Sequence, residues 1–105
     1  MFGSNFLQIL QKDNIDTTNV TFTETSPTSV ATILVDTTGR NAIAVNFGAT
    51  LELAESDVDF AIEAIKQSKI LVTTRMVNEA VALHSLKLAK ENGRELLFFC
   101  FVLNF

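Results

Sequence analysis

The sequence predicts an α/β fold that combines a small β hairpin with a βαβ part of a parallel sheet. Two observations predict it. Residues 30–47 alternate in side-chain character on both sides of one glycine, which is typical of a hairpin. Residues 69–103 follow the order strand, helix, strand, which packs as a right-handed crossover in a parallel sheet. Because two parallel strands alone make a poor sheet, we expect the chain to form part of a larger layer.

Composition sets the broad class of the protein. A chain of 105 residues, 48% apolar and 19% charged, suits one small globular domain. Eight Lys and Arg against twelve Asp and Glu, with no basic block, exclude nucleic acid as an expected partner. The longest apolar run, residues 96–103, is well short of the roughly 20 residues that span a bilayer. A single cysteine and no signal-peptide pattern predict a cytoplasmic protein.

The first 29 residues predict one helix and one short β-rich segment. Residues 2–12 have helical periodicity and are followed by the turn-prone pair Asp13-Asn14. The apolar face of this helix consists of Phe2, Phe6, Ile9 and Leu10. Residues 18–25, TNVTFTET, are rich in β-branched side chains, and Pro27 ends that segment.

The register of the hairpin decides which side chains share a face, since a slip of one residue exchanges the two faces. An even loop would mix bulky and small residues on both sides. A three-residue loop, Thr37-Thr38-Gly39, places glycine at the left-handed position and is preferred. One face is then wholly apolar: Ala31, Ile33, Val35, Ile43, Val45 and Phe47. The other carries Thr32, Ala44 and Asn46 with Val30 and Leu34.

The second half of the chain predicts two helices and two strands. Residues 56–67 form a helix that starts with Ser56 and Asp59, and its buried stripe is Val58, Ala61, Ile62 and Ile65. Residues 69–73 form a strand, and a last strand covers 95–103. Between them Asn78 caps a helix that runs through Asn92 and stops at Gly93. Its inward side chains are Ala80, Leu83, Leu86 and Ala89.

Few residues offer chemistry of their own. The four glycines build no phosphate-binding loop. His84 lies beside Lys87 and Glu91 without a second ligand at metal spacing, so we expect a solvated surface histidine. The carboxylates of Asp57, Asp59 and Glu63 are expected on a solvated helix face instead of in acid–base catalysis.

Two further positions are candidates. Cys100 sits in an apolar run with no cation beside it, which is typical of an inert buried cysteine. Arg75 and Met76 directly follow the strand 69–73, where parallel sheets place ligands. An ordinary strand-to-helix loop is the favoured alternative at this position.

The order of these segments resembles the PfkB-type carbohydrate kinases, and among them most closely ribokinase. The resemblance extends from FGSNFLQILQKDNIDTTNV through TSVATILVDTTGRNAIAVNFGAT and LELAESDVDFAIEAIKQSKILV to LHSLKLAKENG. Family members have Thr-Gly-Val, Gly-Glu-Asn and Gly-Ala-Asn around the hairpin. The corresponding residues here are Thr28-Ser29-Val30, Gly39-Arg40-Asn41 and Gly48-Ala49-Thr50.

The resemblance implies a partial ribokinase-like fold, a single incomplete domain over 1–105. Its lid strands would cover about 20–47, and its α/β portion would comprise residues 1–14 and 51–105. It implies the family activity, ATP-dependent phosphorylation of ribose, for which the family uses ATP and magnesium. The hairpin would be a lid that closes over the sugar and pairs two subunits in a dimer. The sugar-binding residues it implies are Ala31, Ile33 and Val45.

Departures from the family pattern predict that the isolated chain is inactive. Thr74-Arg75-Met76 replaces Gln-Leu-Glu, and Met76 cannot accept the hydrogen bond of a sugar hydroxyl. Phe99-Cys100-Phe101-Val102 replaces Asn-Pro-Ala-Pro. The early sugar-binding glycines, the nucleotide site and the Gly-Ala-Gly-Asp motif of the family are absent, so no catalytic, cofactor-binding or metal residue is predicted. We therefore expect a truncated or variant ribokinase-like product.

Two other interpretations stay open. The chain could be a non-catalytic interaction module that pairs through its lid, since apolar edge strands invite partners. It could also fold poorly, because residues 98–105 are uncharged, β-prone and lack proline.

Overall fold

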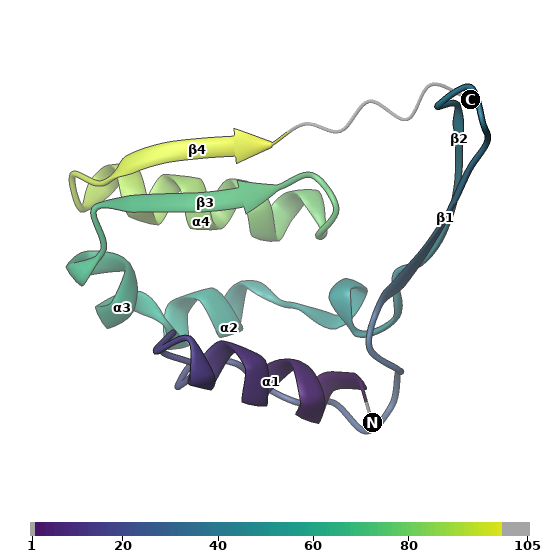
Figure 1. The fold of residues 1–105 in the computed structure, drawn as a ribbon. Coiled ribbons are helices and arrows are strands. Elements are labelled where there is room, and N and C mark those ends of the chain that lie inside the picture. Colours follow the sequence, from purple (N-terminus) through teal and green to yellow (C-terminus); the bar gives the residue numbers. More distant parts are fainter. Residues whose placement is uncertain (1, 100–105) are drawn as a thin grey trace. The chain divides into compact units, whose positions relative to one another are not determined.

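The computed structural model describes residues 2–99 and, within that range, side chains from Gly3 onward. Its element order is α1 (Phe2–Lys12), β1 (Val30–Val35), β2 (Asn41–Asn46), η1 (Gly48–Glu52), α2 (Glu55–Phe60), α3 (Ile62–Gln67), β3 (Ile70–Thr74), α4 (Glu79–Glu91) and β4 (Glu95–Phe99), as Figure 1 shows. An antiparallel hairpin and a parallel strand pair confirm the predicted α/β class. No helix of the described range is long and apolar enough to cross a membrane.

The chain divides between Thr50 and Leu51 into two compact units. The first contains α1, an irregular connection and the hairpin β1–β2. The second contains the helices α2 to α4 with the strands β3 and β4. All the buried apolar side chains of the described residues belong to the second unit, so the single domain predicted over 1–105 stays a prediction.

Helix α1 has the predicted bounds, but its exposed face differs from the prediction. Leu7 and Leu10 are half-buried, whereas Phe6 and Ile9 are 59% and 57% exposed. Gly3 lets the helix approach the following connection closely, since a Cβ there would lie 3.2 Å from the Thr28 Oγ1 atom. The helix therefore packs on its own connection with only part of the predicted stripe.

The expected β-rich segment at 18–25 is wrong, and the hairpin strands begin only at Val30. The backbone is bonded locally instead. The Thr18 amide and hydroxyl donate to Asp16 Oδ1 at 2.9 and 2.6 Å, and the Thr25 amide donates to Thr23 Oγ1 at 3.1 Å. Such side-chain acceptors compete with strand pairing for the backbone amides. Among the described residues, this segment has no neighbouring strand with which it pairs.

The second unit has the only hydrophobic core among the described residues. Its buried members are Val58, Ile65, Val81 and Ala89, with Leu71 and Leu88 packed against them. The predicted helix over 56–67 is two helices, because the backbone leaves helical geometry at Ala61 (φ −86°, ψ 9°). The predicted Ser56 and Asp59 start is also wrong: α2 begins at Glu55, where Asp57 Oδ2 accepts the Ala54 amide at 2.8 Å.

Helix α4 has the predicted caps at both ends. Asn78 Oδ1 accepts the Ala80 amide at 3.0 Å. At the other end Gly93 has φ +69°, and the Gly93 and Arg94 amides donate to the carbonyls of Lys90 and Ala89 at 3.0 and 2.9 Å. These are the two hydrogen bonds of a Schellman motif.

The buried face of α4 is rotated from the predicted one. Ala89 is buried as expected, but Ala80 and Leu83 are exposed and Leu86 is half-buried. The buried side chains are Val81, Ala82, Ser85 and Ala89. Ser85 is tolerated inside because its hydroxyl donates to the Ala82 carbonyl at 2.8 Å, so this buried hydroxyl is not left without a hydrogen bond.

The βαβ arrangement over β3, α4 and β4 is confirmed. The strands pair in parallel from Ile70↔Glu95 to Thr74↔Phe99. Helix α4 lies behind both strands in the view of Figure 1 and contacts both. The predicted strand 95–103 is seen as Glu95–Phe99, and Cys100 with the rest of that prediction falls outside the described residues.

Candidate functional site

The hairpin brings the three predicted site residues onto one face. In the antiparallel register Ala31 pairs with Val45 and Ile33 pairs with Ile43. Directly paired residues share a face, and Ile33 lies two positions along the strand from Ala31, so all three point to the same side. The register and the three-residue loop agree with the prediction, although Phe47 lies just past the end of β2.

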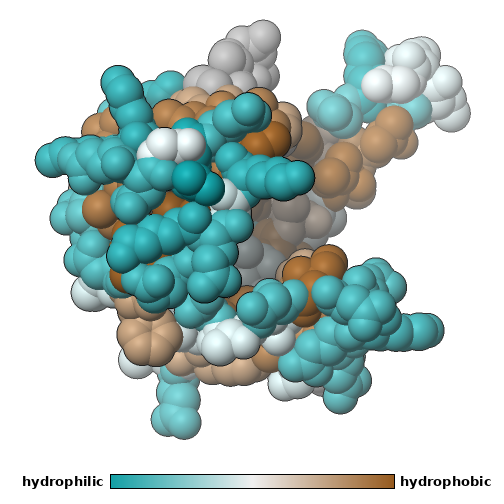
Figure 2. Space-filling view, turned by 90° about the vertical axis from the view of Figure 1, so that its left-hand side faces the viewer, coloured by the Kyte–Doolittle hydropathy of each residue, from teal (hydrophilic) through white to brown (hydrophobic). Residues whose placement is uncertain are grey.

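This apolar face, made by Ala31, Ile33, Val35, Ile43 and Val45, is largely open. Ile33 is 56% exposed and Ile43 is 40% exposed, while Val45 is half-buried. The opposite face is open too, with Leu34 at 68%. In Figure 2 the more distant hairpin shows hydrophobic surface below a hydrophilic tip. Apolar side chains are thus exposed on both faces of this two-stranded layer. Exposed apolar patches of this kind are typical of interaction sites.

Asp36 organises the turn at the hairpin tip. Its Oδ1 atom accepts the Thr38 amide at 2.8 Å, the Thr38 hydroxyl at 2.6 Å and the Arg40 amide at 3.0 Å. Its Oδ2 atom accepts from Arg40 Nε at 2.8 Å. The hydrogen bonds from Thr38, with a smaller effect from Arg40, lower the pKa of Asp36 to about 2. Gly39 completes the turn at φ +84°.

The two legs of the hairpin are joined at its base. The Ala49 amide donates to the Pro27 carbonyl at 2.9 Å, and the Gly48 amide donates to Asn46 Oδ1 at 3.1 Å. Gly48 has φ +44°, and a Cβ on it would lie 2.1 Å from the Pro27 carbonyl oxygen. Only glycine fits this close approach, so the Gly48 position determines how the hairpin leaves the rest of its unit.

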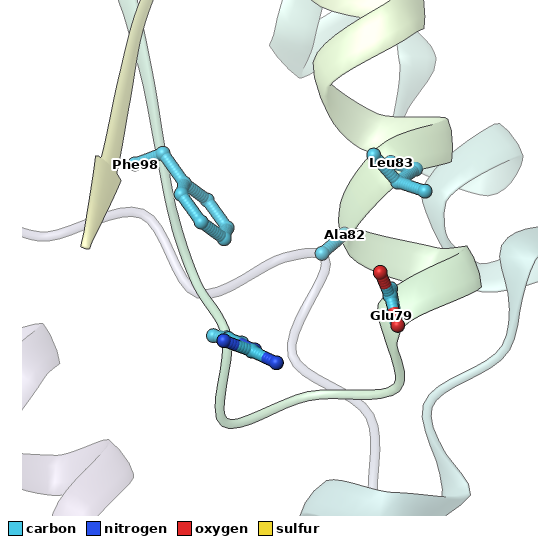
Figure 3. A pocket seen from close by; sticks show the side chains of 5 residues that line it. Glu79, Ala82, Leu83 and Phe98 are labelled. Carbon is cyan, nitrogen blue, oxygen red and sulfur yellow. The ribbon is translucent and has the colours of Figure 1, made fainter. Parts of the chain in front are cut away.

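A second candidate lies at the carboxyl ends of β3 and β4. A hollow of about 330 Å³ there is lined by Arg75, Glu79, Ala82, Leu83 and Phe98. In Figure 3 the Phe98 ring points from the strand side toward α4, where Ala82 and Glu79 lie. Arg75 was predicted as a candidate, whereas Met76 is not among the lining residues; its amide is 3.4 Å from Thr74 Oγ1. The lining therefore combines one cation and one carboxylate with three apolar side chains.

A second hollow, of about 340 Å³, lies at the root of the hairpin in the first unit. Its lining residues are Asn5, Phe6, Ile9, Thr28, Ser29 and Val30. It is mainly apolar and contains no titratable side chain. This explains where the exposed Phe6 and Ile9 of α1 lie, but it places no reactive group there.

The predicted solvated histidine is wrong. His84 on α4 is only 24% exposed, and its Nε2 atom lies 2.7 Å from Oδ1 of Asp59 on α2. Sequence periodicity missed this pair, because its two members are far apart in the chain and meet only when α2 packs on α4. Asp59 lies on a solvated face as predicted, with its side chain 60% exposed, but it also contacts His84, and this contact joins two helices of the second unit.

The carboxylates of residues 2–99 form no cluster of three. Asp57 accepts the Ala54 amide, Glu63 pairs with Lys66 at 2.7 Å, and Asp36 pairs with Arg40. Across residues 2–99, no three His, Cys, Asp or Glu side chains come together as a metal site would require. Magnesium is usually bound by one or two carboxylates together with substrate phosphates, and no cluster of three such side chains marks a metal site among the described residues.

The whole chain matches one protein family. The model of the pfkB family carbohydrate kinases matches residues 1–105. The chain belongs to this family. The ribokinase of Dictyostelium discoideum is 37% identical over 92 residues, which cover 88% of this chain and 29% of that protein. Mouse ribokinase is 29% identical over 97 residues, covering 92% of this chain and 30% of the relative.

A solved structure of a ribokinase has the same fold. The ribokinase of Giardia lamblia superposes with a TM-score of 0.75 over 95% of this chain and 33% of that one, at 21% identity. This pfkB-family chain thus spans about a third of the length of its relatives, and its elements adopt the ribokinase-like arrangement. Sequence reasoning missed Asp36 and Glu79. Asp36 has a weak signal, since an Asp before Thr-Thr-Gly indicates a turn, whereas nothing local indicates Glu79.

Proposed function

We propose that this chain is the lid-bearing segment of a ribokinase-like kinase, whose activity is ATP-dependent phosphorylation of ribose or a related sugar. Ala31, Ile33 and Val45 cover the sugar. One observation supports this role above the others: the register gathers these three side chains on one apolar face, which is largely exposed. The relatives named ribokinase support the choice of sugar.

An apolar cover has a definite purpose in phosphoryl transfer. The reaction depends on positioning and on charges that act strongly only where water is excluded. A face of aliphatic side chains removes water without offering a competing nucleophile. The bonded turn at Asp36 and the joined base at Pro27 and Ala49 keep the two strands of that cover together.

We further propose that the chain of 105 residues does not phosphorylate sugar alone. Asp57 and Asp36 are engaged in a helix cap and an ion pair, and Met76 stands where a sugar-binding glutamate is expected. The chain also spans 29% to 30% of the curated ribokinases it matches. Purified chain is expected to give no heat with ribose or MgATP and no ATP turnover.

A chimera tests the role of the hairpin. In this chimera, residues 30–47 of the present chain replace the aligned segment of the Dictyostelium ribokinase. The phosphorylation of ribose by the chimera is then measured. We expect the chimera to keep its activity, and we expect Ile33→Asp to raise the KM of the chimera for ribose at least tenfold. Leu34→Asp is the matched control, because Leu34 is comparably exposed but lies on the opposite face. Equal KM values for the two variants would refute the sugar-covering role.

A second candidate function is a non-catalytic module that pairs through the hairpin. It is favoured by the opposite face, where Val30 is 42% and Leu34 68% exposed. Sedimentation of the purified chain tests it: pairing predicts a dimer that Leu34→Asp converts to monomer. A chain that sediments as a monomer at all concentrations would exclude this alternative.

A further inference from the structure

The turn that joins α4 to β4 contains a residue pair that is able to react with itself. Asn92 is the only asparagine of the chain that a glycine follows. In such a pair the backbone nitrogen of the glycine can attack the side-chain amide carbon of the asparagine, since glycine has no Cβ to obstruct the approach. Asparagine is accordingly counted among the thermolabile residues. In this chain the pair forms the cap that ends α4 (Figure 1).

In the folded chain both reacting groups are held in hydrogen bonds. The side-chain amide nitrogen of Asn92, Nδ2, donates to the Leu88 carbonyl at 2.8 Å. The Gly93 amide, which contains the attacking nitrogen, donates to the Lys90 carbonyl at 3.0 Å. Attack requires the Gly93 nitrogen to lose the proton that it donates, so this hydrogen bond has to open before any reaction.

The backbone of Asn92 also keeps the two groups apart. Closure of a five-membered ring needs the Gly93 nitrogen on the same side of the Asn92 Cα–C bond as Cβ. At ψ 12° this nitrogen is instead nearly eclipsed with the backbone nitrogen of Asn92, so the bond has to rotate first. Arg94 opposes this rotation, because its amide donates to the Ala89 carbonyl at 2.9 Å and its Nε atom donates to the Asn92 carbonyl at 2.8 Å. Its Nη1 atom also donates to the Ser68 carbonyl at 3.0 Å.

We propose that Asn92 is a site of spontaneous deamidation and that the closed cap of α4 controls its rate. When the cap opens, a bond forms between the Gly93 nitrogen and Asn92 Cγ, and the bond between Cγ and Nδ2 breaks. The Gly93 nitrogen loses its proton to solvent, and Nδ2 takes up a proton and leaves as ammonia. One water then opens the five-membered imide at either carbonyl, which gives aspartate or isoaspartate. This inference does not depend on the proposed function.

The modified chain is unable to rebuild the cap. Aspartate at this position puts a carboxylate oxygen beside the Leu88 carbonyl, in place of the donor that bonded to it. A negative charge at the C-terminal end of a helix is also unfavourable. Isoaspartate in addition lengthens the backbone by one carbon, which displaces the capping amides of Gly93 and Arg94. Because Leu88 packs against the core of the second unit, loss of the cap is expected to destabilise that unit.

The test measures deamidation at neutral pH by proteolysis and mass spectrometry. The samples are the folded chain, the chain in urea, and a synthetic peptide of residues 86–97 as the unfolded reference. We expect Asn92 to convert at least tenfold more slowly in the folded chain than in the peptide, because only the open cap reacts. In urea the two rates are expected to agree. Asn46 is the internal control: it is exposed too, but Phe47 follows it, so we expect it to convert at least tenfold more slowly than Asn92 in urea.

Arg94→Ala tests whether the cap is the gate. The rate of each variant is divided by the rate of a peptide that carries the same substitution, so that direct effects on the chemistry cancel. We expect this ratio to rise at least threefold for Arg94→Ala. It is expected to change less than twofold for Lys87→Ala, which alters an exposed residue of the same helix. Circular dichroism checks that the helices persist, and urea below the unfolding transition replaces Arg94→Ala if they do not.

Asn92→Asp reproduces one product and is expected to lower the urea midpoint more than Asn92→Ala, which removes the amide without adding a charge. Equal rates in the folded chain and the peptide would overturn the proposal. So would faster conversion of Asn46 than of Asn92 in urea, or equal ratios for Arg94→Ala and Lys87→Ala. Asn92→Asp and Asn92→Ala chains of equal stability would refute the expected damage to the cap.

Discussion

Single side chains determine the geometry of the hairpin at both of its ends. At the tip, the Asp36 carboxylate accepts four hydrogen bonds, which together hold the turn Thr37-Thr38-Gly39 closed. At the base, Gly48 permits an approach to the Pro27 carbonyl that no other residue allows. Both features are local, and both lead to measurable predictions.

The turn is expected to depend on pH at the acid end. Hydrogen bonds to the ionised Asp36 lower its pKa from 3.8 to about 2 in the folded chain. Because the folded pKa is the lower one, the contribution to stability is fully present above pH 3.8 and is lost as the pH falls toward 2. The Thr38 and Arg40 amide shifts, followed by NMR, are expected to titrate with a midpoint near 2. A midpoint at or above the ordinary value would contradict this assignment.

Gly48→Ala is expected to lower the free energy of unfolding by about 1–3 kcal/mol, because the new Cβ meets the Pro27 carbonyl and φ is positive. Gly39→Ala is the matched control: φ is +84°, but nothing lies within 4 Å of the added Cβ. Its cost is therefore limited to the backbone, roughly 1 kcal/mol. Urea denaturation monitored on the hairpin compares the two, and equal costs would exclude the steric role of Pro27.

The face that a helix buries depends on tertiary packing as well as on the sequence pattern. Helix α4 shows both effects. Its caps follow from Asn78 and Gly93 and were predicted, because capping depends on local chemistry. Its buried face was not, because Ser85 is polar in the sequence and becomes compatible with the core only through its bond to the Ala82 carbonyl. The hairpin register was predictable for the same reason as the caps, since one glycine and one loop length decide it.

Two substitutions distinguish the observed α4 face from the predicted one. Ser85→Leu is expected to cost about 1–3 kcal/mol of unfolding free energy, because it adds volume inside a packed core. Leu83→Ser is expected to change it by less than about 0.5 kcal/mol, since Leu83 is 60% exposed. Chemical denaturation gives both values. The face predicted from the sequence would rank them in the opposite order.

At the scale of the whole molecule, stability is distributed unevenly between the two units. The buried apolar residues of the described chain, Val58, Ile65, Val81, Ala82 and Ala89, all belong to the second unit. The hairpin of the first unit is held by its antiparallel ladder and by hydrogen bonds at the turn and at the base. The contact between His84 and Asp59 could not be predicted from the sequence. Two residues that are distant in the chain and meet only after packing leave no periodic signal in the sequence.

Native-state hydrogen exchange is expected to follow this division. Amides of α4 and β3 should exchange slowest, through opening of the core, while those of β1 and β2 should exchange far faster. Mass spectrometry after proteolysis resolves the two sets. Equal protection of the hairpin and α4 would show that the first unit shares the cooperative stability of the second.

The joined base of the hairpin has a mechanical consequence. Because the Ala49 amide donates to the Pro27 carbonyl and so ties the two legs together, we expect the legs to turn as one stiff unit instead of splaying. Strands of six residues, at a rise of about 3.4 Å per residue, make the hairpin about 20 Å long. A rotation of roughly 10° at its fulcrum, Gly48, would swing the Asp36 tip by about 3.5 Å, so backbone torsion at one glycine is amplified into a displacement comparable to the width of a water molecule.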